Sequence, residues 1–379
     1  MDHEWIVLIS STVVLTVSVL LTGIIIPQIL LIAFRKNLFD EIDGRKIHRG
    51  PVPRLGGFAF LPAILFSLGF VVGFSIILGD MNIVMLFVEK LKGISFSLCA
   101  VLIMYLVGMS DDLVGVKYRA KFMAQILSAA FIIAGGLYIP SLSGLFGIGE
   151  LPLWCSYLLT GLVFVFIVNA INLIDGIDGL ASGMSSVALI FYAYLFFHMG
   201  KFLYMFLAMA SLGALLPFFY FNVFGDANKH KKIFMGDTGA LIIGTVLSIL
   251  AIRVSGSDLT DIGFGSPLVV AFAPLIVPGL DVVRVFLHRM RAGRSPFLPD
   301  RTHIHHKFLA LGLTPRLAMC SVMAVFVVFS IANIFCSRFM NINVLVLGNL
   351  IVWVAFNILL TRAIYRRQSK LNLTKPLYE

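Results

Sequence analysis

The sequence predicts an all-α, polytopic integral membrane protein with about eleven transmembrane helices. Of its 379 residues, 59% are hydrophobic and only 13% are charged, whereas about a quarter of the residues in a soluble domain are charged. So few charges cannot cover a water-soluble surface, so we expect the long apolar runs to lie in a bilayer. Bilayer-spanning backbone must satisfy its own hydrogen bonds, which leaves helices or a closed barrel. The runs have helical length and lack strict alternation, which favours helices.

The apolar runs follow one another without a soluble domain between them. The first, from Trp5 to about Phe34, has no basic region before it and is too long for the apolar core of a signal peptide. We therefore expect a retained helix, and one transmembrane domain over residues 1–379. The eleven expected spans centre near residues 18, 67, 101, 129, 163, 190, 211, 247, 276, 325 and 354.

The basic residues predict how these spans are oriented. Alternate loops hold 24 of the 29 Lys and Arg residues, and such loops face the cytosol. The N-terminus is then outside and the C-terminus is cytosolic. The net charge of +10 is mainly this topology signal, and no pattern typical of nucleic-acid binding accompanies it. The opposite loops keep five basic residues, Lys90, Lys92, Lys201, Arg253 and Arg338.

Five polar segments fall in the loops expected at the cytosolic face. In "GRKIHRGPVPRLGG", residues 44–57, His48 and Arg49 precede a Gly-Gly pair where the second span begins. Backbone N–H groups at a helix start suit anions, although a basic loop with a turn explains the same residues. In "GMSDDLVGVKYRAKF", residues 108–122, Asp111 and Asp112 lie at the cytosolic end of the third span. Two acidic residues there run against the excess of basic residues on this face, which favours a functional role over a plain solvated turn.

The third segment, "NAINLIDGIDGLASG", covers residues 169–183. Asn169 and Asn172 are three residues apart and share a helix face, and Asp175 and Asp178 each precede a glycine in an expected tight turn. Four such groups suit a hard cation or the polar edge of a ring. A turn joining two helices explains the Asp-Gly pairs but leaves the two asparagines unexplained.

The last two segments also combine acids and bases. In "FMGDTGALIIG", residues 234–244, Asp237 is a candidate functional acid, or only a helix N-cap. In "SPFLPDRTHIHHKF", residues 295–308, three histidines lie among arginines and a lysine. A histidine-rich tract raises the question of zinc. Their spacing is poor for one helix face, and the surrounding cations favour an anion site instead.

The five segments together offer carboxylates and amides that suit a cation, and basic groups that suit anions. This combination favours a membrane enzyme that acts on a phosphorylated or nucleotide-linked substrate. Mg²⁺ binds through one or two carboxylates and substrate phosphates, and a lipid co-substrate would explain the hydrocarbon-embedded chain. A secondary transporter is the competing class, because transporters bind their substrates between interrupted helices. The ninth span has such an interruption at Pro274, Pro278 and Gly279, and the charged residues Asp281 and Arg284 follow it. The acids nevertheless cluster at span ends and form no matching pair in two halves, which favours the enzyme.

Five motifs in one order resemble the polyprenyl-phosphate N-acetylhexosamine-1-phosphate transferases, the group of MraY, WecA and TagO. They are "RKIHRGPVPRLGG", "SDDLVGVKYRAKF", "NAINLIDGIDGLASG", "FMGDTGAL" and "DRTHIHHKF", spread over residues 45–308. The resemblance implies that undecaprenyl phosphate attacks the sugar-side phosphorus of a UDP-N-acetylhexosamine. The implied products are undecaprenyl-diphosphate-sugar, which initiates a cell-envelope polysaccharide such as O-antigen, and UMP.

The resemblance also implies roles for the site residues. Asp237 would be the ligand of Mg²⁺, with Mn²⁺ as an alternative, and Asn172 would lie beside the metal and the diphosphate. Asp175, Asp178 and Phe234 would line the uridine pocket. The three histidines His303, His305 and His306 would contact phosphates or sugar. Further substrate-binding residues expected in these segments are His48, Arg49, Lys117, Lys121, Asn169 and Arg301.

Asp111 and Asp112 are the disputed pair of the family, since one of them is often proposed as a general base. A phosphate monoester is already largely ionised at neutral pH and has little need of a base. We therefore expect these two carboxylates to position the metal, the basic 117–121 segment or a water, with a base role open if the lipid binds protonated.

The last motif bears on the donor. MraY, which uses a nucleotide-linked muramyl pentapeptide, typically has three consecutive histidines here, whereas His303-Ile304-His305-His306 resembles the WecA/TagO pattern. The "VPRLGG" ending of the first motif points the same way. We expect UDP-GlcNAc as donor, ahead of UDP-GalNAc, a 6-deoxy donor or the muramyl pentapeptide. The resemblance places the protein in the bacterial inner membrane with a cytosolic active site, and allows a homodimer.

Overall fold

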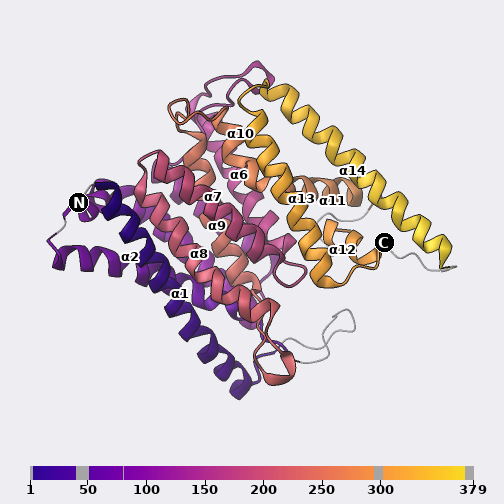
Figure 1. The fold of residues 1–379 in the computed structure, drawn as a ribbon, viewed down its shortest axis with the longest axis horizontal. Helices are drawn as coiled ribbons and strands as arrows, with labels where there is room; N and C mark the ends of the chain where they lie inside the picture. Colours follow the sequence, from indigo (N-terminus) through magenta and orange to yellow (C-terminus); the bar gives the residue numbers. More distant parts are fainter. Residues whose placement is uncertain (1–2, 40–50, 80, 294–301, 372–379) are drawn as a thin grey trace.

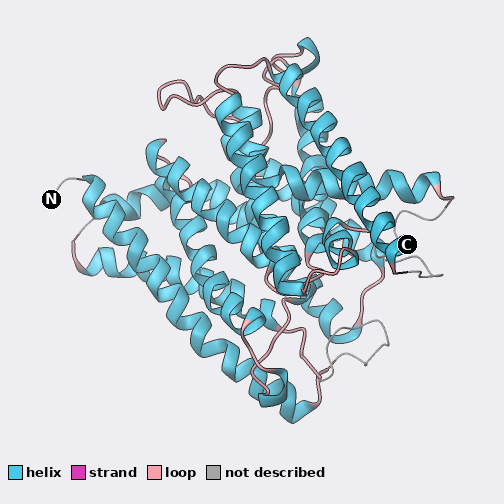
Figure 2. Cartoon of the chain, turned by 45° about the vertical axis from the view of Figure 1, so that its right-hand side comes forward, coloured by secondary structure: helices cyan, strands magenta, loops and turns pink. Residues whose placement is uncertain are grey.

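The computed structural model describes residues 3–39, 51–79, 81–293 and 302–371. Over these ranges the chain consists of helices and loops, with one isolated bridge between Ser141 and Glu150 (Figure 2). The helices are α1 (His3–Lys36), α2 (Phe60–Ile77), α3 (Met81–Glu89), α4 (Leu91–Val114), α5 (Tyr118–Ala134), α6 (Leu153–Ile174), α7 (Leu180–His198), α8 (Phe202–Val223), α9 (Gly236–Ser255), α10 (Pro267–Phe272), α11 (Ile276–Arg291), α12 (Ile304–Ala310), α13 (Pro315–Cys336) and α14 (Ile342–Lys370).

Ten helical segments of the described chain are long and apolar enough to cross a membrane. The prediction of an all-α, polytopic membrane protein is confirmed. The eleventh expected span, near residue 129, falls on α5, which has 17 residues. This is about the minimum for a span, and the first turn of α5 carries Arg119 and Lys121, so its apolar part is shorter still.

Helix α9 forms the centre of the bundle, while α1 and α14 lie at opposite edges (Figure 1). Of the most apolar part of α9, 94% is buried, against 22% for α4 and α14. The helix is apolar on all sides, as expected of a helix enclosed by others. Its buried hydroxyls bond to the helix backbone one turn earlier, Thr245 to the Leu241 carbonyl and Ser248 to the Gly244 carbonyl.

The ninth expected span is interrupted. A short 3₁₀ turn, Ala273–Leu275, separates α10 from α11, and Pro274 lies within it. Proline cannot donate a backbone hydrogen bond and disrupts the preceding helical turn. The break lets α11 leave the direction of α10 and carry Asp281 toward the segment that contains the histidines.

Candidate active site

The first turn of α9 is held by Asp112, at the end of α4. One carboxylate oxygen accepts the backbone N–H of Asp237 at 2.8 Å; the other accepts the Thr238 N–H at 2.9 Å and the Thr238 hydroxyl at 2.6 Å. These amides would otherwise lack partners, and an acid is favourable at a helix N-terminus. Gly236 has φ +73°, and a Cβ there would lie 2.6 Å from the Asp112 Oδ2. Asp112 therefore fixes where Asp237 begins α9.

The Asp237 side chain faces two other helices. Its Oδ1 accepts a hydrogen bond from the Asn172 amide of α6 at 2.5 Å, and its Oδ2 lies 3.1 Å from the Lys121 Nζ of α5. Lys121 also forms an ion pair with the Asp111 carboxylate, which in turn accepts the Val116 N–H at 2.6 Å. One ammonium group thus lies between two carboxylates. Asp237 does not cap α9 with its side chain, so that alternative is wrong.

The oxygen atoms of Asp237, Asp111 and Asn172 are the kind of ligand that suits a divalent cation. Two carboxylates already bracket one cation, and rotation of the Asn172 amide would present its oxygen to the same point. Over the described ranges, no group of three or more His, Cys, Asp and Glu side chains is arranged to hold a metal ion. An ion at Asp237 would therefore take further ligands from substrate phosphates and water, as Mg²⁺ commonly does.

The turn between α6 and α7 adds two more carboxylates. Asp178 is paired with Lys232 of the loop before α9, at 2.6 Å. Surrounding protein and the charges of Asp178 and Asp237 raise the pKa of Asp175 to about 7, although its side chain is exposed to solvent. Because the side chain contacts water, we attribute more of this rise to repulsion between carboxylates than to dehydration. Such a cluster favours the binding of a cation or of hydrogen-bond donors.

The first motif contacts the segment that precedes α9. The Gly56 and Gly57 N–H groups donate to the carbonyls of Phe234 and Met235, each at 2.9 Å, and the Phe234 N–H donates to the Pro53 carbonyl at 2.9 Å. These glycine amides are therefore not available for an anion. The motif instead holds the backbone of Phe234, whose side chain is half-buried. His48, Arg49 and Arg301 lie outside the described residues.

The histidine segment is anchored by Asp281 of α11, which is fully buried. Its carboxylate lies 2.9 Å from the His303 Nδ1, accepts the Ile304 N–H at 3.1 Å, and pairs with Arg284 at 2.8 Å. From the sequence, Asp281 and Arg284 were expected to matter only in the transporter alternative, and their contact with the histidine segment was not predicted. The signal was an acid inside an apolar span, three residues before an arginine on the same helix face.

His305 packs directly on the turn between α6 and α7. A Cβ at Gly176 would lie 2.2 Å from the His305 Nε2, so only glycine leaves room for the ring. Burial, followed by the neighbouring His306 and His303, lowers the pKa of His305 to about 3, so this ring is neutral at pH 7. Its two nitrogens have no hydrogen-bond partner in the described part of the chain. A neutral imidazole can donate one hydrogen bond and accept another.

Two expected site residues lie apart from Asp237. Asn169 exchanges hydrogen bonds with Gln125 of α5, at 2.7 and 3.3 Å, so its amide joins two helices. Lys117 is exposed at the start of α5. The other described candidates meet around the start of α9 and around Gly176: Asp111, Asp112, Lys121, Asn172, Asp175, Asp178, Phe234, Asp237, His303, His305 and His306.

Comparison with known proteins bears on this site. Residues 94–255 match the sequence model of the family described as glycosyl transferase family 4. The chain is 31% identical over 363 residues to a Bacillus subtilis (strain 168) protein named probable undecaprenyl-phosphate N-acetylglucosaminyl 1-phosphate transferase. This alignment covers 94% of the chain and 90% of the relative. It is 32% identical over 291 residues to the undecaprenyl-phosphate alpha-N-acetylglucosaminyl 1-phosphate transferase of Escherichia coli (strain K12), with 76% and 73% covered. The resemblance of the five motifs is confirmed: the chain belongs to glycosyl transferase family 4, in the MraY/WecA group of polyprenyl-phosphate sugar-1-phosphate transferases.

Proposed function

We propose that this chain transfers N-acetylhexosamine 1-phosphate from a UDP-sugar to undecaprenyl phosphate in a Mg²⁺-dependent reaction. One observation carries the proposal. Chain segments far apart in sequence meet near the start of α9: the end of α4 with α5, and the end of α6 with the turn that follows it, on which α12 packs at Gly176. They bring carboxylates, a lysine and a histidine to one place, as transfer between two phosphates requires.

The proposed reaction makes and breaks one bond each at the same phosphorus. An oxygen of the lipid phosphate attacks the sugar-side phosphorus, and the bond from that phosphorus to the bridging oxygen breaks, which releases UMP. The attacking phosphate is largely ionised at neutral pH, so the main barrier is the approach of two anions. Mg²⁺ bound at Asp237 would neutralise part of this charge, and Lys121 is placed to do the same.

In this proposal Asp111 and Asp112 are positioning residues. Asp111 holds Lys121, and Asp112 holds the first turn of α9. Both carboxylates have their oxygens occupied by donors of the protein. Neither therefore needs to take a proton during the transfer, and neutral His305 would donate a hydrogen bond to a phosphate or to the sugar.

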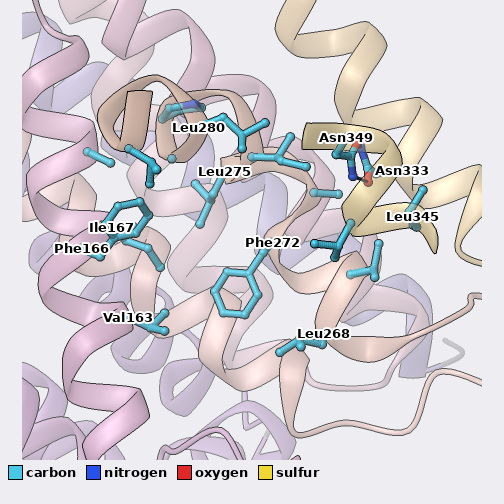
Figure 3. Close-up of a pocket in the computed structure, with 18 of the residues that line it drawn as sticks. Val163, Phe166, Ile167, Leu268, Phe272, Leu275, Leu280, Asn333, Leu345 and Asn349 are labelled. Atoms are coloured by element: carbon cyan, nitrogen blue, oxygen red, sulfur yellow. Dashed lines mark hydrogen bonds between the residues drawn. The ribbon is translucent and has the colours of Figure 1, made fainter. Parts of the chain in front are cut away.

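An apolar pocket supports a lipid acceptor. A cavity of about 360 Å³ lies between α6, α10, α11, α13 and α14, and Figure 3 shows its wall of aliphatic and aromatic side chains. Asn333 and Asn349 in this wall bond to each other at 3.0 Å, so they leave the rest of the wall apolar. Gly279 and Leu280 line the cavity and immediately precede Asp281. A prenyl chain in this pocket would have its phosphate near the histidine segment.

We place the start of α9 on the cytosolic face, because the basic loops lie at that end of the spans. The donor is then available from the cytosol and the acceptor from the bilayer. Single-cysteine variants measure this orientation in whole cells. A cysteine at Ala227 should react with an impermeant reagent only after permeabilisation, and a cysteine at Asn341 should react without it. Labelling of the Ala227 site from outside would overturn the assignment.

For the donor we propose UDP-GlcNAc. The relatives described above carry names of N-acetylglucosaminyl 1-phosphate transferases, and the histidine motif resembles the WecA/TagO pattern. UDP-GalNAc, a 6-deoxy donor and the muramyl pentapeptide remain the alternatives. The transporter alternative is dropped, because the family consists of transferases.

The test is a transfer assay with purified protein, undecaprenyl phosphate and Mg²⁺. UMP should be released from UDP-GlcNAc, and EDTA should stop the release. The same assay with each alternative donor reports the preference, which for a substituent in a fitted polar pocket is expected to exceed about tenfold. Product from the muramyl pentapeptide donor and none from UDP-GlcNAc would overturn the donor assignment, and turnover without metal would overturn the mechanism.

A further inference from the structure

A second cavity lies at the other end of α9. It has a volume of about 380 Å³ and is formed by α2, the end of α3, α4, the segment that follows α5, α8 and α9. Arg253, at the C-terminal end of α9, lines it. Sixteen residues separate Arg253 from Asp237, which is about 24 Å along a helix. The cavity therefore opens toward the membrane face opposite the candidate active site and plays no part in the proposed transfer.

The wall of this cavity is apolar and its rim is basic. Leu61, Leu68 and Ile249 are among the side chains of the wall, while Lys90 and Lys92 stand at the start of α4. Glu89 is the acidic residue of the lining. An apolar interior with positive charges at one end matches the two parts of an anionic lipid, an acyl chain and a phosphate.

The positive charges gather here against the general trend of the chain. Only five Lys and Arg residues lie at this end of the spans, in loops or at helix ends, as the bias toward cytosolic cations requires. Three of them, Lys90, Lys92 and Arg253, line this one cavity. Lys201 is not part of the lining, but burial and the charge of Arg253 lower its pKa to about 8, so these two cations repel each other.

Among the described residues, none of the ion pairs includes Arg253, Lys90 or Lys92. Arg253 lies over the Tyr204 ring at 5.5 Å, and its buried Nε has no hydrogen-bond partner within the described ranges. A buried N–H group without an acceptor is costly, and a phosphate is an acceptor that arginine binds strongly.

We propose that this cavity binds an anionic phospholipid, with its phosphate at Arg253 and the rim lysines and one acyl chain against the apolar wall. Because the site is separate from the Asp237 end, lipid binding there and transferase activity can be measured independently. The occupant differs from the undecaprenyl acceptor in location, since it would lie at the far end of α9.

Native mass spectrometry of the purified full-length chain tests this proposal. The probes are phosphatidylglycerol and phosphatidylcholine with the same acyl chains. Wild-type protein should retain phosphatidylglycerol in preference, and Arg253→Gln should weaken its binding about tenfold, the effect of losing one charge-assisted hydrogen bond. The matched control is Arg338→Gln, which removes the same charge on the same face; Arg338 lies over Phe264 at 5.1 Å, outside the cavity, and its variant should bind like wild type.

A second variant tests the apolar part. Ser97→Phe would fill the cavity that Ser97 lines without changing any charge, and should also reduce phosphatidylglycerol binding. UMP release by each variant verifies that it is folded. Equal retention of the two lipids, or equal binding by the Arg253→Gln and Arg338→Gln variants, would overturn the proposal and leave an apolar cavity without selectivity for anions.

Discussion

Two carboxylates, Asp237 and Asp281, stand on neighbouring parts of the bundle in opposite situations. The Asp281 side chain is fully buried and is surrounded by His303, Arg284 and the Ile304 amide. The Asp237 side chain is 29% exposed, and its partners among the described residues are the Asn172 amide, the Asp111 carboxyl and Lys121, which it shares with Asp111. Asp281 is committed to holding protein groups in place, whereas Asp237 keeps accessible oxygens for a ligand.

This difference separates binding from positioning. A buried carboxylate must be matched by donors of the protein, so its removal disturbs the groups it holds. An accessible carboxylate among others of the same charge has unmet demand for a cation, so its removal abolishes ligand binding and leaves the fold. The following substitutions distinguish the two cases.

Asp237→Asn should have the largest effect. It removes the negative charge that would hold the divalent cation, and charge stabilisation is the main requirement of phosphoryl transfer. We expect UMP release to fall by about a thousandfold or more, with unchanged insertion and thermal unfolding temperature. Steady-state assays over a range of Mg²⁺ concentrations measure it.

Asp258→Asn is the matched control for this experiment. It makes the same chemical change in a loop at the other end of α9, where Asp258 is exposed and accepts hydrogen bonds from Thr260. Its turnover should equal that of wild type. Wild-type turnover by the Asp237 variant would remove Asp237 as the metal ligand.

Asp281→Asn should have an intermediate effect. The amide keeps the shape of the side chain but weakens the contact that orients the His303 ring, and the loss of such an orienting carboxylate typically costs about 10–100-fold in activity. We expect kcat to fall by this amount with little change in the Mg²⁺ concentration needed for half-maximal rate. A parallel loss of Mg²⁺ affinity would contradict the separation of the two carboxylates.

A double variant identifies the route of this effect. If Asp281 acts through His303, Asp281→Asn should reduce activity in the wild-type background and add little in a His303→Gln background. Full additivity of the two substitutions would show that Asp281 stabilises the bundle without orienting the histidine.

The contrast between the two carboxylates also marks what could be predicted from the sequence. The spans could be predicted from the length of the apolar runs. The polar residues at the span ends were identified as site candidates because acids and amides there are otherwise unexplained: Asp111, Asp112, Asn172 and Asp237. Which residue fills which role depended on packing. The contact of Asp112 with Thr238 joins positions 126 residues apart, and no local pattern contains that information.

The differences between these expectations and the structure have the same origin. Asn169 and Asn172 share a helix face, yet one turn of α6 suffices to place Asn169 against Gln125 and Asn172 against Asp237. From the sequence alone, the Gly56 and Gly57 amides suit an anion. In the structure they donate instead to the Phe234 and Met235 carbonyls. Asp281 was passed over because its partner His303 lies 22 residues away, beyond the end of α11.

The smallest predicted effect concerns Asp175, the exposed carboxyl near Asp237 whose pKa is raised to about 7 from its ordinary 3.8. A raised pKa in the folded state contributes stability that is fully present below about pH 4 and is lost as pH rises through about 7. In Mg²⁺-free buffer, the unfolding temperature of wild type should therefore fall between pH 5 and 7.5 relative to that of Asp175→Asn, by a few degrees at most because the side chain contacts water. Scanning fluorimetry of the two proteins side by side measures the difference, and adding Mg²⁺ should diminish it, since a bound cation offsets the repulsion from Asp178 and Asp237. Parallel pH curves for the two proteins would show that the Asp175 carboxyl titrates with no coupling to folding and that the carboxylate cluster is already fully hydrated.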